Sequence, residues 1–312
     1  MSARTLPLRH LLLALIAVCI WGTNFVAIKV ALRELPPLLL CAVRFTLVAL
    51  PAVFFLRRPA VPWRQLLLYG ITMFGLHFGF LFLGMKLGMS AGLASLTLQF
   101  QVFVTLALAV AVLKERVAFV QVAGALVACG GFILVAVHTG GDVTLAGLVC
   151  ILLGASSWGF ANFTSKRIGR VNPLALVVWG SLVVPIPMTL ASLAFEGRAL
   201  VVQSLTHVSA PTFLSVAFIV YGSTLVAYSL WSWLLSHYPA SSVAPFTLLV
   251  PVFGMLSSAA LLGESLPSWK LQAATLVIVG LALNVFGPRF LRGRGASSGA
   301  SAPAAASAVE RA

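Results

Sequence analysis

The sequence predicts an all-α membrane protein with ten transmembrane helices, arranged as two inverted five-helix repeats. Three observations support this prediction: the composition, the length of the apolar runs, and residues that recur in both halves. Of the 312 residues, 61% are hydrophobic and 8% are charged, whereas ordinary soluble domains have about 45–50% and about 25%. A water-soluble fold of this size cannot bury so much apolar surface.

The apolar residues form runs of about 20 residues, the length of helix that crosses the hydrocarbon core of a bilayer. Lipid permits only helices or closed barrels, and the short alternating segments typical of barrel strands are absent from the sequence. The runs in the first half are Leu11–Val30, Leu38–Leu56, Leu66–Met85, Leu93–Leu113 and Val117–Val137. The runs in the second half are Leu145–Ser165, Leu174–Phe195, Phe213–Leu235, Ser242–Gly263 and Ser268–Phe286.

The two halves share residues at two fixed offsets, which indicates an internal duplication. An offset of 137 aligns Trp21, Gly22, Lys29 and Pro36 with Trp158, Gly159, Lys166 and Pro173. An offset of 149 aligns Ala91, Ala111, Leu113, Glu115, Ala125, Gly131 and Leu134 with Ala240, Ala260, Leu262, Glu264, Ala274, Gly280 and Leu283. The extra residues of the second half are placed in a longer polar connection around 196–211.

Each copy has an odd number of spans, so the second copy is inserted upside down relative to the first. We therefore divide the chain into a first repeat (1–137), a second repeat (144–290) and a disordered cytoplasmic tail (295–312). The tail is rich in Ala, Ser and Gly, a composition that favours disorder.

The net charge of +14 could indicate a nucleic-acid partner, but its distribution along the chain favours a topological explanation. With a cytoplasmic N-terminus, most cations fall on the inner side: Arg4, Arg9, Arg57, Arg58, Arg64, Lys114, Arg116, Lys166, Arg167, Arg170, Arg289, Arg292, Arg294 and Arg311. Those in or beside the outer connections are Arg33, Lys86, Arg198 and Lys270. This positive-inside bias predicts a multi-pass protein of the bacterial cytoplasmic (inner) membrane with both termini in the cytoplasm.

The sequence lacks the motifs expected of an enzyme or of an ATP-driven pump. It contains no HExxH, no GxSxG, no close pair of acidic residues within a span, and no GxxxxGK[ST]. The cysteines Cys19, Cys41, Cys129 and Cys150 lie in apolar runs without metal-ligand spacing. We therefore expect no enzymatic activity, no cofactor and no metal.

Two of the ionisable residues inside the predicted spans, Arg44 and His77, have two interpretations each. Arg44 is a charge that must face protein or water; it either anchors its helix near the outer surface or binds a carboxylate. His77, between Gly75 and Gly79, either packs in a close helix contact or takes part in proton coupling. A small multidrug exporter that exchanges cations for protons needs a carboxylate within a span, and this chain has none there.

Polar and aromatic residues at helical spacing form faces that could line a cavity or pack in the core. The faces are Trp21 with Asn24, Trp158 with Asn162, and the stripe Tyr221, Thr224, Tyr228 and Trp231. Gln99 and Gln101 point to different sides of one helix, so one of them is expected to face a central path. Prolines that can bend helices stand at 185, 187, 245 and 251.

Three stretches resemble the EamA family of the drug/metabolite transporter superfamily. They are WGTNFVAIKVALRELPPLLLCAVRF (Trp21–Phe45), GMSAGLASLTLQFQVFV (Gly88–Val104) and VAPFTLLVPVFGMLSSAALLGE (Val243–Glu264). The acidic residues that close the fourth and ninth spans of the family match Glu115 and Glu264. Within the family the stretches are most similar to the bacterial exporters of O-acetylserine and cysteine, which implies export of small amino-acid metabolites.

The sequence therefore predicts a secondary exporter for a small, amino-acid-like substrate, present as a monomer or homodimer. A broad-specificity drug or dye exporter and a non-transporting membrane subunit are the alternatives. The residues predicted to line the substrate cavity are Trp21, Asn24, Arg44, Gln99, Trp158, Asn162 and Tyr228, with His77 for proton coupling.

Overall fold

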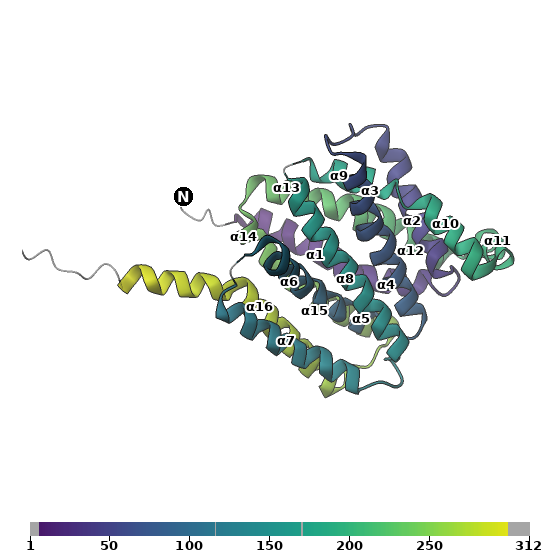
Figure 1. Ribbon diagram of the computed structural model, residues 1–312. Coiled ribbons are helices and arrows are strands. Elements are labelled where there is room, and N and C mark those ends of the chain that lie inside the picture. The colour runs from purple at the N-terminus through teal and green to yellow at the C-terminus, as the bar shows by residue number, and fades with distance from the viewer. Residues whose placement is uncertain (1–5, 116, 170, 299–312) are drawn as a thin grey trace, which may run out of the picture.

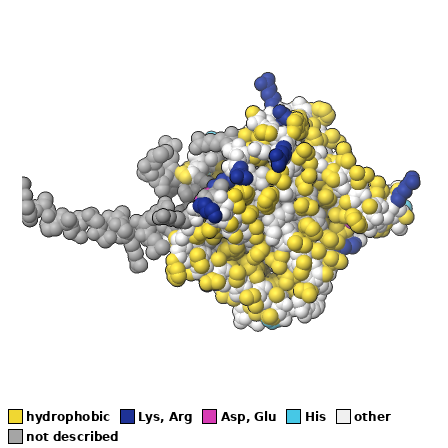
Figure 2. Space-filling model, viewed as in Figure 1, with side chains coloured by type: hydrophobic (Ala, Val, Ile, Leu, Met, Phe, Trp, Pro, Cys, Tyr) yellow, Lys and Arg dark blue, Asp and Glu magenta, His cyan; other side chains and the backbone are white. Residues whose placement is uncertain are grey.

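A computed structural model describes residues 6–115, 117–169 and 171–298 of the chain. Within these residues the structure is helical, with no strands beyond an isolated bridge between Gly140 and Val143. The helices pack side by side in one bundle, and α16 projects beyond it (Figure 1). Hydrophobic side chains cover most of the surface seen in Figure 2, with few Lys and Arg among them. Such a surface suits a lipid environment.

The helices of the first half follow the predicted runs, several of them in shorter pieces. They are α1 (Leu8–Ala31), α2 (Pro37–Val53), α3 (Trp63–Gly70), the π-helix η1 (Ile71–Leu76), α4 (His77–Lys86), α5 (Ala91–Thr97), the 3₁₀-helix η2 (Leu98–Phe100), α6 (Gln101–Leu113) and α7 (Phe119–Val137).

The second half repeats this order with more interruptions. Its helices are α8 (Leu145–Ile168), α9 (Pro173–Ser181), α10 (Pro185–Ser192), the π-helix η3 (Leu193–Gly197), α11 (Arg198–Thr206), α12 (Ala210–Ala217), the π-helix η4 (Phe218–Val226), α13 (Ala227–His237), α14 (Ala240–Val243), the 3₁₀-helix η5 (Ala244–Leu249), α15 (Val250–Leu262) and α16 (Ser268–Ser298).

Nine helices of the described residues are long and apolar enough to cross a membrane, some of them assembled from consecutive pieces. Helix α2, at 17 residues, is apolar but shorter. The chain is thus a multi-pass membrane protein, and the tenth span stays a prediction.

Local sequence signals explain where the helices begin. Side chains of Ser90, Thr144, Asn172 and Ser209 accept a hydrogen bond from a backbone N–H of the first turn of α5, α8, α9 and α12, as N-cap residues do. Two of the four predicted proline interruptions are observed, since α10 begins at Pro185 and Pro245 lies in η5. Pro187 lies within α10, and Pro251 lies in the first turn of α15.

Two segments differ from the sequence predictions. The polar connection expected around 196–211 is helical through Thr206, so the apolar helix 173–206 has 34 residues. Glu196 can lie within this apolar helix because its carboxylate accepts hydrogen bonds from the backbone N–H groups of Leu38 and Leu39, at 2.7 and 3.1 Å. Helix α16 continues to Ser298, so residues 295–298 of the expected disordered tail are helical, and 299–312 lie outside the described residues.

The two sequence offsets recur in the helix bounds. Helices α1 and α8 both have 24 residues, and 8–31 becomes 145–168 at the offset of 137. Helices α7 and α16 begin at Phe119 and Ser268, 149 residues apart. The π-helices η1 and η4 occupy corresponding spans. An inverted orientation of the halves stays a prediction.

Glycines permit the closest helix contacts. A Cβ on Gly124 of α7 would lie 2.5 Å from the carbonyl oxygen of Gly280 in α16. The reverse contact, from a Cβ on Gly280 to the carbonyl oxygen of Gly124, would be 2.4 Å. Small residues of this kind let helices associate closely within a membrane.

We number the connections between the ten predicted spans along the chain. Hydrogen bonds link the odd-numbered connections, which follow the first, third, fifth, seventh and ninth spans, at one face of the bundle, which we call the odd face. Ser90 N–H donates to the Asp142 carbonyl at 3.1 Å, the Lys86 amine donates to the Leu32 carbonyl at 2.7 Å, and Ser209 N–H donates to the Glu34 carboxylate at 2.9 Å. The opposite, even face holds the start of α1 and the ends of α2, α6, α8 and α13.

Candidate functional site

The deepest charged side chain among the described residues is Arg44 of α2, which is 1% exposed. Its guanidinium lies over the Phe78 ring, 4.0 Å from the centroid, and Nη2 donates to Thr224 Oγ at 3.0 Å. Arg44 belongs to neither of the two ion pairs found in the described residues, Lys166–Glu115 and Lys270–Asp142. Its Nε and Nη1 atoms are buried without a hydrogen-bond partner. A buried cation in this state can bind an anion at two further N–H groups.

The π-helix η4 supplies the protein partner of Arg44. The Thr224 hydroxyl donates to the Ile219 carbonyl at 2.9 Å and accepts from Arg44. The Ser223 carbonyl accepts from Trp21 Nε1 at 3.1 Å. Irregular π-type turns of this kind often occur at functional sites. The turn thus joins α1 and α2 of the first half to the second half.

Aromatic side chains of both halves pack beside this turn. The Trp21 ring lies 5.3 Å from the Tyr228 ring and 5.1 Å from the Trp231 ring, centroid to centroid. Tyr221 is 50% exposed, so it leaves the predicted stripe and faces outward. The structure therefore brings Trp21, Arg44 and Tyr228 together around η4, and their place in a substrate cavity stays a prediction.

His77 connects Arg44 to Trp158. His77 is 2% exposed, and its Nδ1–H donates to the Gly154 carbonyl at 3.0 Å. The imidazole ring lies 4.9 Å from the Trp158 ring and 4.4 Å from the Phe78 ring, centroid to centroid. The Arg44 guanidinium lies over that same Phe78 ring. The side chain is thus packed and hydrogen-bonded between α4 and α8, and its role in proton coupling stays a prediction.

The predicted amide residues divide into two groups. Asn24 and Gln99 are 5% and 7% exposed. Asn24 Oδ1 has no hydrogen-bond partner, whereas Gln99 Nε2 is 3.5 Å from the Thr247 carbonyl. Asn162 instead donates to Gln101 Oε1 at 2.8 Å. The Asn162 side chain is therefore paired with Gln101, the glutamine outside the predicted set, and a single cavity shared by all the predicted residues stays a prediction.

Phe78, which lies against Arg44, and the buried Thr97 of α5 escaped selection from the sequence. Phe78 gives no polar signal, and only its position one residue after His77 places it near the predicted face. Thr97 is 0% exposed, and its hydroxyl has no partner. A hydroxyl in an apolar run is too common in membrane helices to be selected alone.

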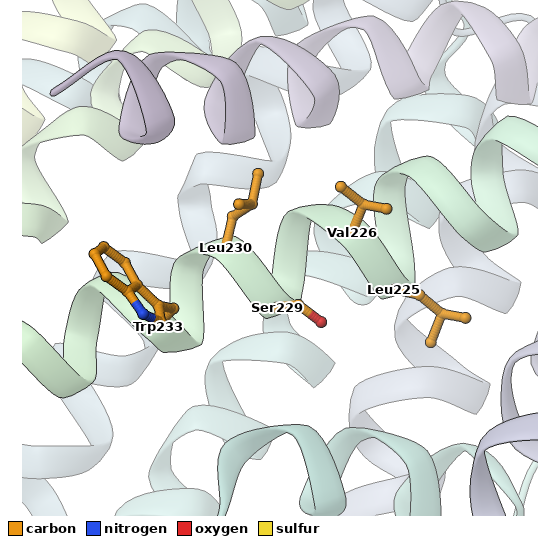
Figure 3. A pocket seen from close by; sticks show the side chains of 5 residues that line it. All are labelled: Leu225, Val226, Ser229, Leu230 and Trp233. Carbon is orange, nitrogen blue, oxygen red and sulfur yellow. The ribbon is translucent and has the colours of Figure 1, made fainter. Parts of the chain in front are cut away.

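A hollow of about 450 Å³ lies elsewhere, along the second half of the eighth predicted span. Figure 3 shows its lining, which is Leu225, Val226, Ser229, Leu230 and Trp233. All five belong to η4 and α13, and Val226 and Trp233 are exposed at the outer surface. The hollow is thus a groove on the apolar surface and does not include Arg44.

No group of three or more His, Cys, Asp or Glu gathers in the part of the chain that the structure describes. Its four cysteines are free thiols.

Comparisons with known proteins agree with this architecture. One solved crystal structure has a TM-score of 0.64 at 20% identity, over 91% of this chain and 98% of that one, which indicates a similar fold. A protein of Salmonella typhimurium (strain LT2) called a probable amino-acid metabolite efflux pump is 44% identical over 90% of this chain and 96% of its own length. One of Escherichia coli (strain K12) with the same description is 42% identical over 89% and 95%. The model of the EamA-like transporter family matches residues 8–137 and 145–286, and the chain belongs to this family.

Proposed function

We propose that the protein exports small amino-acid metabolites across the bacterial cytoplasmic membrane as a secondary transporter. Membership of a transporter family and similarity to two probable amino-acid metabolite efflux pumps support this function. O-acetylserine and cysteine are the first candidates for the substrate, from the resemblance of the stretch Trp21–Phe45 and its companions. The described residues offer no carboxylate near Arg44, which disfavours a cationic drug or dye as the substrate.

The proposed topology has ten spans, both termini in the cytoplasm, and two inverted repeats. The helix bounds that recur at offsets of 137 and 149 support the repeats. Arg57, Arg58, Lys166 and Arg167 at the even face support a cytoplasmic even face, because basic residues accumulate on the cytoplasmic side. The odd face then meets the periplasm.

The observation that carries the proposal is the buried, partly unpaired guanidinium of Arg44. Its free Nε and Nη1 groups suit a substrate carboxylate. The unpaired Asn24 Oδ1 and the faces of Trp21 and Tyr228 suit an ammonium group. A zwitterion bound in this way meets no opposing full charge from a protein carboxylate, so release remains easy.

Counterflow in proteoliposomes tests this proposal with a panel of labelled amino acids and derivatives. We expect Arg44→Gln to lower the apparent affinity for the carboxylate-bearing substrate by about 30-fold or more, since truncating a buried charged partner costs about 2–5 kcal/mol. Arg44→Lys keeps the charge but not the two parallel N–H groups, and we expect partial activity.

Arg198→Gln is the matched control, because Arg198 is an exposed arginine of α11. It should leave counterflow unchanged. If Arg44→Gln lost activity only in proportion to its membrane abundance, Arg44 would have a structural role. Absence of any solute flux from the purified wild-type chain would support a non-transporting subunit, and protection of cells from aromatic cations would support the drug exporter.

A further inference from the structure

The carboxylate of Glu264 holds two helices together at the odd face. Glu264 follows α15, and its two oxygens accept the N–H groups of Ala91 and Gly92, at 2.7 and 3.1 Å. These N–H groups begin α5, where the positive end of the helix dipole strengthens the contact. The Lys29 amine donates to the carbonyls of Met85 and Met89 at the adjoining turn.

These ties form the wall of a polar hollow of about 370 Å³. The lining includes Lys29, Arg33, Ser90, Asp142 and Glu264. Asp142 in turn pairs with Lys270 at 2.6 Å. The hollow therefore lies over a closed set of charged contacts on the odd face.

The even face carries the repeat counterparts of these residues. Glu115 corresponds to Glu264 at the offset of 149, and Lys166 corresponds to Lys29 at the offset of 137. The backbone agrees in detail, because Glu115 N–H donates to the Ala109 carbonyl and Glu264 N–H donates to the Ser258 carbonyl, both at 3.3 Å. Each glutamate also follows a residue in the left-handed region, with φ of 55° at 114 and 69° at 263.

The two carboxylates nevertheless have different partners. Glu115 pairs with Lys166, and their side chains are 46% and 55% exposed. The counterparts of Ala91 and Gly92 are Ala240 and Ser241, whose backbone begins α14. In this state the Glu115 carboxylate is held by the Lys166 amine, whereas the Glu264 carboxylate is held by two backbone N–H groups.

The start of the helix that Glu264 contacts is also more buried than its repeat counterpart. All nine residues 91–99 are buried. Among their counterparts at 242–248, only Val243 is buried, and the rest keep accessible surface. The odd-face start of α5 is therefore more deeply buried than the described counterpart residues 242–248.

We propose that Glu264 and Glu115 are alternating latches of the transport cycle. In the state seen here Glu264 closes the odd face. In the opposite state Glu115 leaves Lys166 and accepts the backbone N–H groups of Ala240 and Ser241, while Glu264 releases Ala91 and Gly92. The proposal rests on the proposed inverted repeats, because two inverted halves exchange their conformations as access alternates.

Accessibility of single cysteines in vesicles of both orientations tests the latches without any knowledge of the substrate. Ser95→Cys reports on the odd-face helix, and Thr247→Cys reports on its even-face counterpart. Cys19, Cys129 and Cys150 are replaced by Ser, while the buried Cys41 is retained. The reaction rate with a membrane-impermeant maleimide is measured from each side.

We expect Glu264→Gln to raise the labelling rate of Ser95→Cys from the odd face and to lower that of Thr247→Cys from the even face, each by about tenfold. Glu115→Gln should leave Ser95→Cys protected and Thr247→Cys reactive. Glu196→Gln is the matched control, since its carboxylate also accepts two N–H groups of a helix start. At the offset of 137, which applies before the extra residues of the second half, its counterpart is Pro59, not an acid, so no reciprocal shift is expected.

If Glu264→Gln raised the labelling rates of both Ser95→Cys and Thr247→Cys, or changed neither, the latch would be overturned and Glu264 would have a structural role. A reciprocal shift also in Glu196→Gln would overturn the assignment to the repeat-related pair. Amino-acid flux in the wild-type chain without reciprocal labelling would refute the latches and leave the proposed function intact. Reciprocal labelling without such flux would support the latches and refute the proposed substrate.

Discussion

Single acidic residues join helices in this protein, although acids are scarce in its sequence. Glu34, Glu196 and Glu264 each accept a backbone N–H from the start of another helix. A helix start has unpaired N–H groups and a positive dipole end, so one carboxylate satisfies both. These three glutamates therefore stabilise tertiary contacts at the odd face, which explains why they lie outside the apolar core.

Glu34 gives this stabilisation a pH dependence. Hydrogen bonds from the Ser209 hydroxyl and backbone N–H lower the pKa of the Glu34 carboxyl from its ordinary value of 4.5. A lowered pKa in the folded state means stabilisation that is present above the ordinary value and lost as the pH falls through the folded value. We expect Glu34→Gln to lower the Tm in detergent at pH 7, and the difference from wild type to shrink progressively below pH 4.5.

Ser209→Gly is the companion variant, since it removes the hydroxyl donor and keeps the backbone N–H, and because glycine is tolerated at the N-cap of α12 at a cost of only a few tenths of a kcal/mol. Its Tm difference should be smaller than that of Glu34→Gln at pH 7 and should shrink in the same range. A difference between wild type and Glu34→Gln that is constant with pH would contradict the role of the charged carboxylate.

Among single residues, the sequence predicts Arg44 as a residue of the site but does not predict which side chains contact it. Arg44 is evident because a charge within a span needs a reason. Its partner Thr224 lies in the predicted stripe, but only the π-turn brings the hydroxyl to the guanidinium. Gln99 and Gln101 are two residues apart, and spacing alone leaves open which one faces a central path; the structure pairs Gln101 with Asn162.

At the scale of helices, apolar runs and proline positions predict most of the elements, while breaks within runs are less visible. The helix 173–206 passes Glu196 because the carboxylate finds partners on α2, and a loop prediction from polarity cannot include that contact. The π-helices η1 and η4 carry no distinct sequence signal. They arise within runs that predict regular helices.

Helices α7 and α16 provide a test of helix packing. A Cβ on Gly124 would lie 2.5 Å from the Gly280 carbonyl oxygen, whereas one on Gly130 of the same helix would meet nothing closer than Leu276 at 4.0 Å. We expect Gly124→Ala to destabilise the protein by about 1–3 kcal/mol through overpacking. The shift in Tm of the detergent-solubilised protein measures this effect.

Gly130→Ala adds the same methyl group and the same gain in helix propensity, about 1 kcal/mol. It should leave the Tm unchanged or raise it. Equal shifts for the two variants would show that close packing of α7 against α16 does not limit stability.

At the scale of the whole molecule, the charge distribution and the repeat offsets together determine the proposed topology. The predicted runs, the family match and the helical structure agree on a multi-pass bundle. The orientation in the membrane depends on Arg57, Arg58, Lys166 and Arg167 being at the even face. No contact within the chain can fix that orientation, because it is set by the insertion machinery and the bilayer.

A reporter fused after Phe290 tests the orientation. We expect a fluorescent protein that folds only in the cytoplasm to be bright at this position, and alkaline phosphatase to be inactive there. A fusion after Arg33, in the connection that follows α1, should behave in the opposite way. Active phosphatase after Phe290 would place the even face in the periplasm and reverse the direction of the proposed export.

The unpaired guanidinium of Arg44 also bears on what drives turnover. It is a fixed positive charge within the electric field of the membrane, worth about 2.3 kcal/mol per 100 mV for a full crossing. A zwitterionic substrate adds no net charge, so the loaded and the empty protein respond to voltage in the same way. The effects on the outward and return steps then cancel over a full cycle. Under the proposed function, the membrane potential biases which face is open, while the concentration gradient of the metabolite sets the direction of net flux.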